Sequence, residues 1–149
     1  MAVGAFTFYN RAKRKLSGGG IDLAAGAFRA QLHTSASNAA TATLSTISQV
    51  TTEVTEANGY SSSGKALATK VWTAGASAAQ MKFDADDHSW SANGGTISNI
   101  KFMVFWASGA SAGARHVLGY IQLSTSQFNL AAGNRLTIAY PSGGIFTLA

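Results

Sequence analysis

The sequence lacks cysteine, which excludes disulfide bonds, thiolate metal sites and cysteine nucleophiles. It also lacks any apolar run approaching the roughly 20 residues of a membrane-spanning helix. At the N-terminus the charged residues follow a short apolar patch, the reverse of the order in a secretory signal, so we expect no export by that route. Stability must therefore come from packing, hydrogen bonds or self-association.

Charge is scarce as well. Charged residues make up only 11% of the chain, against about 25% in typical soluble domains. Ala, Ser, Thr and Gly supply about half of the residues, whereas a hydrophobic content of 46% argues against disorder. The length predicts a single domain over residues 1–149. A surface of small neutral side chains favours a component of a larger assembly.

The net charge of +5 arises largely from one cluster, because Arg11, Lys13, Arg14 and Lys15 are four of the eleven basic residues. Three interpretations apply: a solvated helix face, a contact with a protein partner, or a contact with nucleic acid or a membrane. A nucleic-acid-binding domain usually spreads basic residues over a whole face. We therefore expect a solvated helix face or a contact with a protein partner, and we expect neither a specific nucleic acid nor a membrane as a partner.

Two short helices are predicted. Phe8, Ala12 and Leu16 follow helical spacing within an N-terminal arm over residues 1–20, and the glycines at 18–20 end that helix. Residues 43–57 also carry apolar side chains at near-helical spacing. That run is rich in Thr and Ser, which are poor helix formers.

The remaining segments predict strands. FRAQLHT at 28–34 alternates, so Phe28, Ala30 and Leu32 should face a core while Arg29, Gln31 and His33 face outward. Further strands are expected in KALATKVWT, AAQMKF, ISNIKFMVFWA, HVLGYIQL, RLTIAY and GIFTL, separated by Gly-, Ser- and Asn-containing joints. Several short strands at regular spacing indicate a mainly β fold, an antiparallel sandwich or barrel.

The strand IKFMVFW at 100–106 is apolar on both faces. One face of a strand in a two-layer β domain normally meets solvent. The second face must therefore be covered by a helix, the N-terminal arm or another subunit. This strand is predicted to be central.

FDADDHSW at 83–90 holds three of the six acidic residues and one of the three histidines. On one continuous strand, Asp84, Asp86 and His88 would share a side, an arrangement that suits a divalent metal. However, Phe83 and Trp90 are an odd number of residues apart, so a single regular strand cannot bury both.

A turn resolves this conflict, because Asp readily hydrogen-bonds its own backbone in turns. The sequence therefore predicts a joint over Asp84–Asp87, with Phe83 and Trp90 both directed inward. Asp84, Asp86 and Asp87 remain a weak candidate for a cation, since packed carboxylates repel unless neutralised.

The sequence offers no convincing catalytic framework. The G-x-S-x-G pattern is matched by GASAG at 109–113, inside the Gly-, Ser- and Ala-rich joint SGASAGA, and the glycine runs lack the phosphate-binding patterns. We interpret His33 as outward-facing and His116 as a residue at a strand end. A glycosidase needs a positioned carboxylate pair, which only FDADDHSW or Glu53 with Glu56 offers. The aromatic residues occupy core-like positions rather than a stacking platform for sugars or single strands. We expect neither an enzyme nor a cofactor.

Several segments together resemble small virion proteins of tailed bacteriophages, namely AVGAFTFYNRAK, GGGIDLAAGAFRAQLHTS, ANGYSSSGKAL, FDADD followed by Trp, and IAYPSGGIFTLA. The similarity spans nearly the whole chain, in order, and such proteins look like capsid decoration or cementing proteins. The resemblance implies a jelly-roll-like β-sandwich that is made in the host cytoplasm. It also implies that this chain binds the major capsid protein on the outer capsid surface as a homodimer or homotrimer. A tail-associated adaptor or receptor-binding module is the alternative.

The N-terminal arm combines aromatic and basic residues on an otherwise nearly neutral chain. We therefore expect it to dock on the capsid lattice or on a sister subunit, through Phe6, Phe8, Tyr9, Arg11, Lys13, Arg14 and Lys15.

Overall fold

Strands dominate the computed structural model, which describes residues 4–109 and 115–149. A six-stranded antiparallel sheet forms the centre of the molecule. Its order is β1 (Phe6–Phe8), β8 (Val117–Gln122), β7 (Ile97–Ala107), β2 (Phe28–Thr34) and β3 (Lys65–Ala66), with β9 (Phe128–Leu130) also paired to β7.

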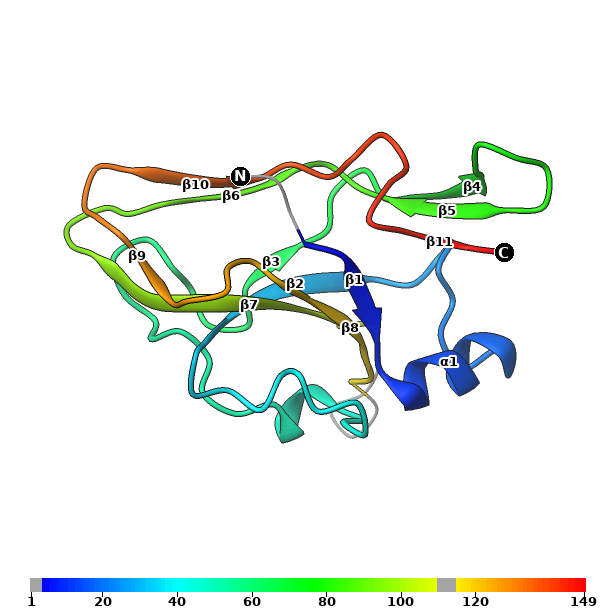
Figure 1. Ribbon diagram of the computed structural model, residues 1–149, viewed down its shortest axis with the longest axis horizontal. Coiled ribbons are helices and arrows are strands. Elements are labelled where there is room, and N and C mark those ends of the chain that lie inside the picture. The colour runs from blue at the N-terminus through cyan, green and yellow to red at the C-terminus, as the bar shows by residue number, and fades with distance from the viewer. Residues whose placement is uncertain (1–3, 110–114) are drawn as a thin grey trace.

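Two smaller antiparallel sheets cover one face of this central sheet (Figure 1). One pairs β10 (Arg135–Ile138) with β6 (His88–Ser91), and the other has the order β11 (Phe146–Leu148), β5 (Met81–Asp84), β4 (Val71–Ala74). Ring contacts join the layers, with centroids 5.4 Å apart for Phe28 and Phe83 and 4.7 Å apart for Phe6 and Phe146. The predicted mainly β, sandwich-like architecture is therefore confirmed, whereas the strand order gives no support to a jelly roll.

The opposite face of the central sheet is covered by the connection after β2, drawn in cyan below the sheet in Figure 1. Backbone hydrogen bonds from Thr34 N–H to the Thr52 carbonyl (3.1 Å) and from Val54 N–H to the Leu32 carbonyl (3.0 Å) fix this connection to β2. Both faces of β7 are consequently buried, from Phe102 to Trp106. The predicted central strand is confirmed, and its second face is covered by the chain's own connection.

This cover also corrects the interpretation of β2. Phe28, Ala30 and Leu32 are buried as predicted, but Gln31 and His33 are buried too, at 6% and 0% exposure. The prediction that these two face outward was wrong, because alternation along a strand cannot show that a distant segment covers the polar-looking face.

The helix predictions are confirmed only in part. Helix α1 spans Asn10–Ser17 and its C-cap is Gly18, in agreement with the predicted glycine stop. Phe8, however, lies in β1 and not in the helix. The prediction of a helix over 43–57 was wrong, because the segment holds only a single 3₁₀ turn, η1 (Ile47–Gln49). A capping box between Thr46 and Gln49 closes this turn. Hydroxyl side chains that bond to nearby backbone compete with longer helices.

The predicted joint between Phe83 and Trp90 is confirmed. The two side chains are 0% and 1% exposed and lie in separate strands, β5 and β6. Asp84 is the last residue of β5, so the connection itself is the three residues that follow it. Strands β1 and β9 were not predicted. The predicted strand over 65–73 is divided, and Thr69 between β3 and β4 adopts a φ of +48°.

Candidate functional site

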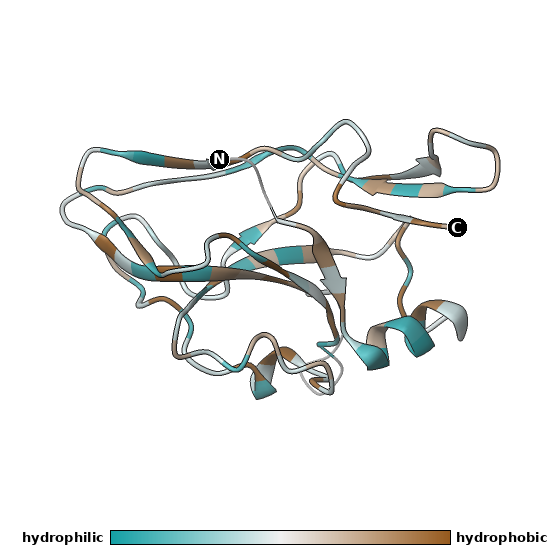
Figure 2. Ribbon diagram, viewed as in Figure 1, coloured by the Kyte–Doolittle hydropathy of each residue, from teal (hydrophilic) through white to brown (hydrophobic). Residues whose placement is uncertain are grey.

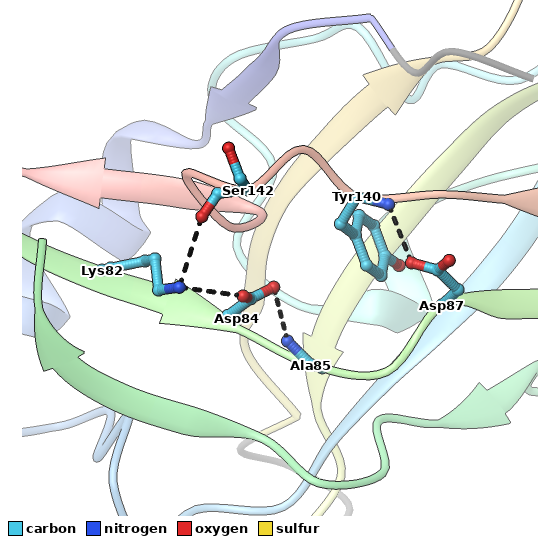
Figure 3. A network of polar contacts seen from close by, with 6 residues as sticks. All are labelled: Lys82, Asp84, Ala85, Asp87, Tyr140 and Ser142. Carbon is cyan, nitrogen blue, oxygen red and sulfur yellow. Dashed lines mark hydrogen bonds and ion pairs between the residues drawn. The ribbon is translucent and has the colours of Figure 1, made fainter. Parts of the chain in front are cut away.

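The acidic joint is held by contacts within the protein (Figure 3). Asp84 Oδ2 lies 3.2 Å from Lys82 Nζ, and Oδ1 accepts the Ala85 N–H at 3.0 Å. The Lys82 ammonium group also donates to the Ser142 carbonyl at 3.3 Å. This carboxylate is therefore neutralised by a lysine of its own strand.

The other two carboxylates have separate partners. Asp86 accepts the Thr69 hydroxyl at 2.7 Å, and Asp87 accepts the Tyr140 N–H at 2.9 Å. Within residues 4–109 and 115–149, no group of three His, Cys, Asp or Glu side chains is placed to hold a metal ion. The three aspartates proposed as a weak cation candidate are thus adjacent in sequence without converging in space.

His88 lies inside the protein and not on the acidic surface. It is 4% exposed, its Nδ1 is 2.9 Å from the Tyr140 hydroxyl, and its ring stacks on Trp90 with centroids 5.7 Å apart. Burial is the main cause that lowers its pKa, and Lys65 lowers the pKa further. A neutral, enclosed imidazole between two aromatic rings is a packing element.

His33 is likewise structural. Its Nδ1 lies 3.0 Å from the Thr51 carbonyl and 3.4 Å from the Ser37 hydroxyl, both in the connection that covers the central sheet. Burial lowers the pKa of this imidazole, although the carbonyls of Thr51 and Thr52 act in the opposite direction. His33 thereby links the cover to β2.

The two members of the second carboxylate pair considered for glycoside chemistry have different surroundings. Glu53 is half-buried and accepts two hydrogen bonds of 2.7 Å, from the Tyr60 hydroxyl and the Ser63 N–H. Glu56 is exposed. One carboxylate is thus held by structural donors, whereas the other lies on the surface.

The structure divides the predicted contact residues of the N-terminal arm into two groups. Tyr9 is 0% exposed and donates its hydroxyl to the Ala39 carbonyl at 2.6 Å. Phe6 and Phe8 are half-buried, and both rings contact Phe146. The aromatic part of the arm therefore belongs to the protein's own packing, and Tyr9 has no surface to offer to a partner.

The basic part of the arm remains on the surface. Arg11, Lys13 and Arg14 are exposed and Lys15 is half-buried. Figure 2 shows the hydrophilic stretches of α1 at the lower edge of the molecule. In the part of the chain that the structure describes, the single ion pair joins Lys82 to Asp84, so none of these four cations is neutralised by a carboxylate.

Two sides of α1 carry different surfaces. Arg11, Arg14, Lys15 and Gly18 recur at helical spacing and line a hollow of about 310 Å³. Burial first, and then the charges of Lys15 and Arg11, lower the pKa of His116. Because these two charges act on it, His116 lies close to this hollow. The tertiary structure therefore brings His116 close to the basic side of the helix, although about 100 residues separate them in sequence. Arg115 instead lies over the Trp106 ring, 5.6 Å from its centroid, and lines a different hollow.

The other side of α1 lines a larger, mainly apolar groove of about 720 Å³. Its lining comes from α1, the turn after it, β4 and the C-terminal segment: Phe8, Lys13, Leu16, Ser17, Gly19, Ile21, Asp22, Leu23, Ala24, Trp72, Leu148 and Ala149. No sequence motif pointed to this groove, because its residues come from segments far apart in the chain. The spacing of Phe8 and Leu16 was the one feature of the sequence that could have indicated this groove.

The N-terminal end of α1 lacks the side chains that usually stabilise the start of a helix. The N-cap residue Tyr9 makes no side-chain cap, and the first turn contains no acidic residue. Backbone N–H groups at a helix N-terminus favour negative charge, whereas this turn carries Arg11. Local helix stability therefore does not account for a basic residue at this position.

Comparison with protein-family models, with curated proteins and with solved structures finds no match to this chain. Among the residues that the structure describes, no helix has the length and apolar character needed to cross a membrane.

Proposed function

We propose that this chain is a structural protein of a tailed-bacteriophage virion that binds and stabilises the capsid shell. The proposal rests on the resemblance of its ordered segments to capsid decoration proteins, and it requires no catalysis. The observation that carries it is the basic side of α1, where Arg11, Arg14 and Lys15 line a hollow without a carboxylate partner among the described residues.

The basic side suits a docking surface for three physical reasons. Its cations are not used to stabilise the fold through ion pairs. It lies on a helix that is fixed in place, since Ala12 is 1% exposed, Tyr9 N–H bonds the Leu118 carbonyl of β8 at 3.2 Å, and Asn10 N–H bonds the Ala42 carbonyl of the connection after β2 at 3.0 Å. Charged rims raise association rates and select partners more than they add affinity.

Weak individual contacts are sufficient for such a role. A shell presents the same acidic surface many times by symmetry, and linked copies gain avidity without new contacts. The proposed partner is therefore the major capsid protein, with this chain on the outer capsid surface. The physical effect is to bridge neighbouring capsid subunits against the pressure of packaged DNA.

The test compares two charge-reversal variants with the same change in net charge. R11E/R14E alters the basic side of α1, whereas K70E/R135E alters cations elsewhere on the surface. Purified proteins are added to capsids that lack the chain, and occupancy is measured by sedimentation and gel densitometry at several salt concentrations. We expect R11E/R14E to lose most binding and K70E/R135E to retain it.

Equal binding by both variants contradicts the assignment of the basic side. Absence of wild-type binding to any capsid contradicts the proposed function. The tail-associated alternative is separated by electron microscopy of gold-labelled protein on whole particles. Label along the tail instead of the shell favours the adaptor or receptor-binding role.

A further inference from the structure

A polar hollow of about 260 Å³ lies between the central sheet and the connection that covers it. This volume exceeds the roughly 30 Å³ share of one water molecule several times. It falls below the roughly 300–1,000 Å³ of pockets for drug-sized ligands. The polar hollow therefore suits a small ligand. Its polar lining is Gln31, Ser48, Glu53, Ser63, Trp106 and Arg115.

Two buried side chains of this lining have polar atoms without a partner. Gln31 is 6% exposed and Trp106 is 3% exposed. Neither Gln31 Oε1 nor the Trp106 Nε1–H has a hydrogen-bond partner among the residues that the structure describes. Both lie on one face of the sheet, because Trp106 pairs with Arg29, two residues from Gln31. Buried polar groups are normally hydrogen-bonded, so these atoms indicate a ligand that supplies a donor to one and an acceptor to the other.

Two opposite charges also line the polar hollow. Glu53 and Arg115 form no ion pair with each other in the described part of the chain. Glu53 uses Oε1 for both of its hydrogen bonds, so Oε2 remains available to a donor. The Arg115 guanidinium group is exposed and lies over the Trp106 ring, from which it can turn toward an anion in the hollow.

The acceptors and the donors occupy different sides of the polar hollow. Gln31 is part of β2, and Glu53 lies beside this strand because it forms a backbone bridge with His33. Trp106 is near the end of β7, and Arg115 lies just before β8. Because β7 lies between β8 and β2 in the sheet, the acceptors line the β2 side and the donors line the β7–β8 side.

We propose that the polar hollow binds a small zwitterion of the size of a free amino acid. The ammonium group of this ligand donates to Gln31 Oε1 and to Glu53 Oε2. Its carboxylate accepts the Trp106 N–H and pairs with Arg115. A neutral sugar would leave both protein charges without a counter-charge, and a simple anion or cation would match only one side.

The polar hollow is separate from the basic side of α1, because the two linings share no residue. The proposal therefore does not depend on binding to a capsid. It can be tested on the purified full chain alone.

L-Alanine is the probe for the test. Alaninamide lacks the carboxylate, N-acetylalanine lacks the ammonium group, and glucose is a neutral molecule of similar size. Binding is followed by NMR of the indole N–H groups, and Trp106→Phe identifies the Trp106 resonance. We expect L-alanine to move this resonance downfield, because its carboxylate accepts the N–H, with a Kd of about 1 mM. The resonances of Trp72 and Trp90 should stay in place, since neither residue lines the polar hollow.

Two substitutions of the same kind test the charged part of the site. Arg115→Gln removes a guanidinium group from the polar hollow, whereas Arg14→Gln removes one from the basic side of α1. Both arginines are exposed, so both variants should fold. We expect Arg115→Gln to weaken L-alanine binding at least about tenfold, the effect of one lost charge-assisted hydrogen bond. Arg14→Gln should bind L-alanine as the wild type does.

Gln31→Met tests the buried acceptor with a side chain of similar volume. The change removes the unsatisfied Oε1, so we expect a melting temperature at least as high as that of the wild type. L-Alanine binding should weaken at least about tenfold. A clear fall in melting temperature would show that the fold itself uses the amide, and it would contradict the proposal.

Three further results overturn the proposal. The first is a Trp106 resonance that does not move at tens of millimolar L-alanine. The second is an equal response to glucose or to either blocked form of alanine, which rules out recognition of a zwitterion. The third is equal L-alanine binding by Arg115→Gln and Arg14→Gln.

Discussion

The hydroxyl group of Tyr60 donates a hydrogen bond of 2.7 Å to a carboxylate oxygen of Glu53, and the same hydroxyl oxygen accepts the Leu32 N–H at 3.0 Å. Tyr60 is 2% exposed, so these bonds lie inside the protein. One side chain thereby joins β2 to the connection that covers the central sheet. The buried second face of β2 and β7 depends on such links.

Removing this hydroxyl should destabilise the protein. Tyr60→Phe leaves the Leu32 N–H without its acceptor and removes one of the two hydrogen bonds to Glu53 Oε1, which keeps the Ser63 N–H. An unsatisfied buried polar group costs about 1–3 kcal/mol. We expect a fall of about 2 kcal/mol in the free energy of unfolding, measured by urea titration. Ser62→Ala, at an exposed position of the same segment, is the control and should stay within about 0.5 kcal/mol of the wild type.

Gly64 should tolerate no side chain. Its φ is +66°, and a Cβ atom there would lie 1.9 Å from the Ala30 carbonyl oxygen of β2. Gly94 has a similar φ of +81°, but its surroundings are open. Gly64→Ala combines backbone strain with a steric clash and should cost at least about 3 kcal/mol, whereas Gly94→Ala carries the strain alone, about 1 kcal/mol. Thermal melting compares the two, and equal losses would contradict the packing of β2 against this turn.

Stability should fall in acid because of His33 and His88. Burial lowers the pKa of both imidazoles below the ordinary value of 6.5, so the unfolded chain binds protons more readily than the folded protein. Their contribution is therefore complete above pH 6.5 and is lost as the pH falls below it, by up to about 1.4 kcal/mol per pH unit for each histidine.

Urea unfolding at intervals between pH 8 and pH 5 measures this slope. Tyr140, Lys65, Asp86 and Asp87 are among the groups around His88. The variants used in these experiments therefore leave Asp86 and Asp87 unchanged. His33→Gln and His88→Gln should each flatten the curve between pH 6.5 and 5. A stability that is constant or rises as the pH falls over this range falsifies the prediction.

The acidic joint should contribute through hydrogen-bond geometry rather than through charge. Asp87→Asn retains a side-chain oxygen to accept the Tyr140 N–H, whereas Asp87→Ala removes it. We expect Asp87→Ala to cost about 1 kcal/mol and Asp87→Asn to cost less than half of that. Differential scanning calorimetry at pH 7 checks the order, and equal losses would indicate that the charge is what matters.

Local patterns in the sequence determined those elements that have a regular spacing of apolar side chains or whose interacting residues are close in the chain. Alternation placed Phe28, Ala30 and Leu32 in the core, and the odd spacing of Phe83 and Trp90 required the joint that separates β5 from β6. The glycines after Ser17 fixed the end of α1. These features follow from side-chain periodicity and backbone freedom, which are properties of the chain itself.

Only the tertiary structure decided which surfaces are covered. Gln31 and His33 are buried because a connection distant in sequence packs over them, and Tyr9 is buried although it adjoins exposed cations. The groove of Leu16, Trp72 and Leu148 likewise exists because the end of the chain returns beside its beginning. Burial and grooves depend on contacts between remote segments, and no local pattern encodes those contacts.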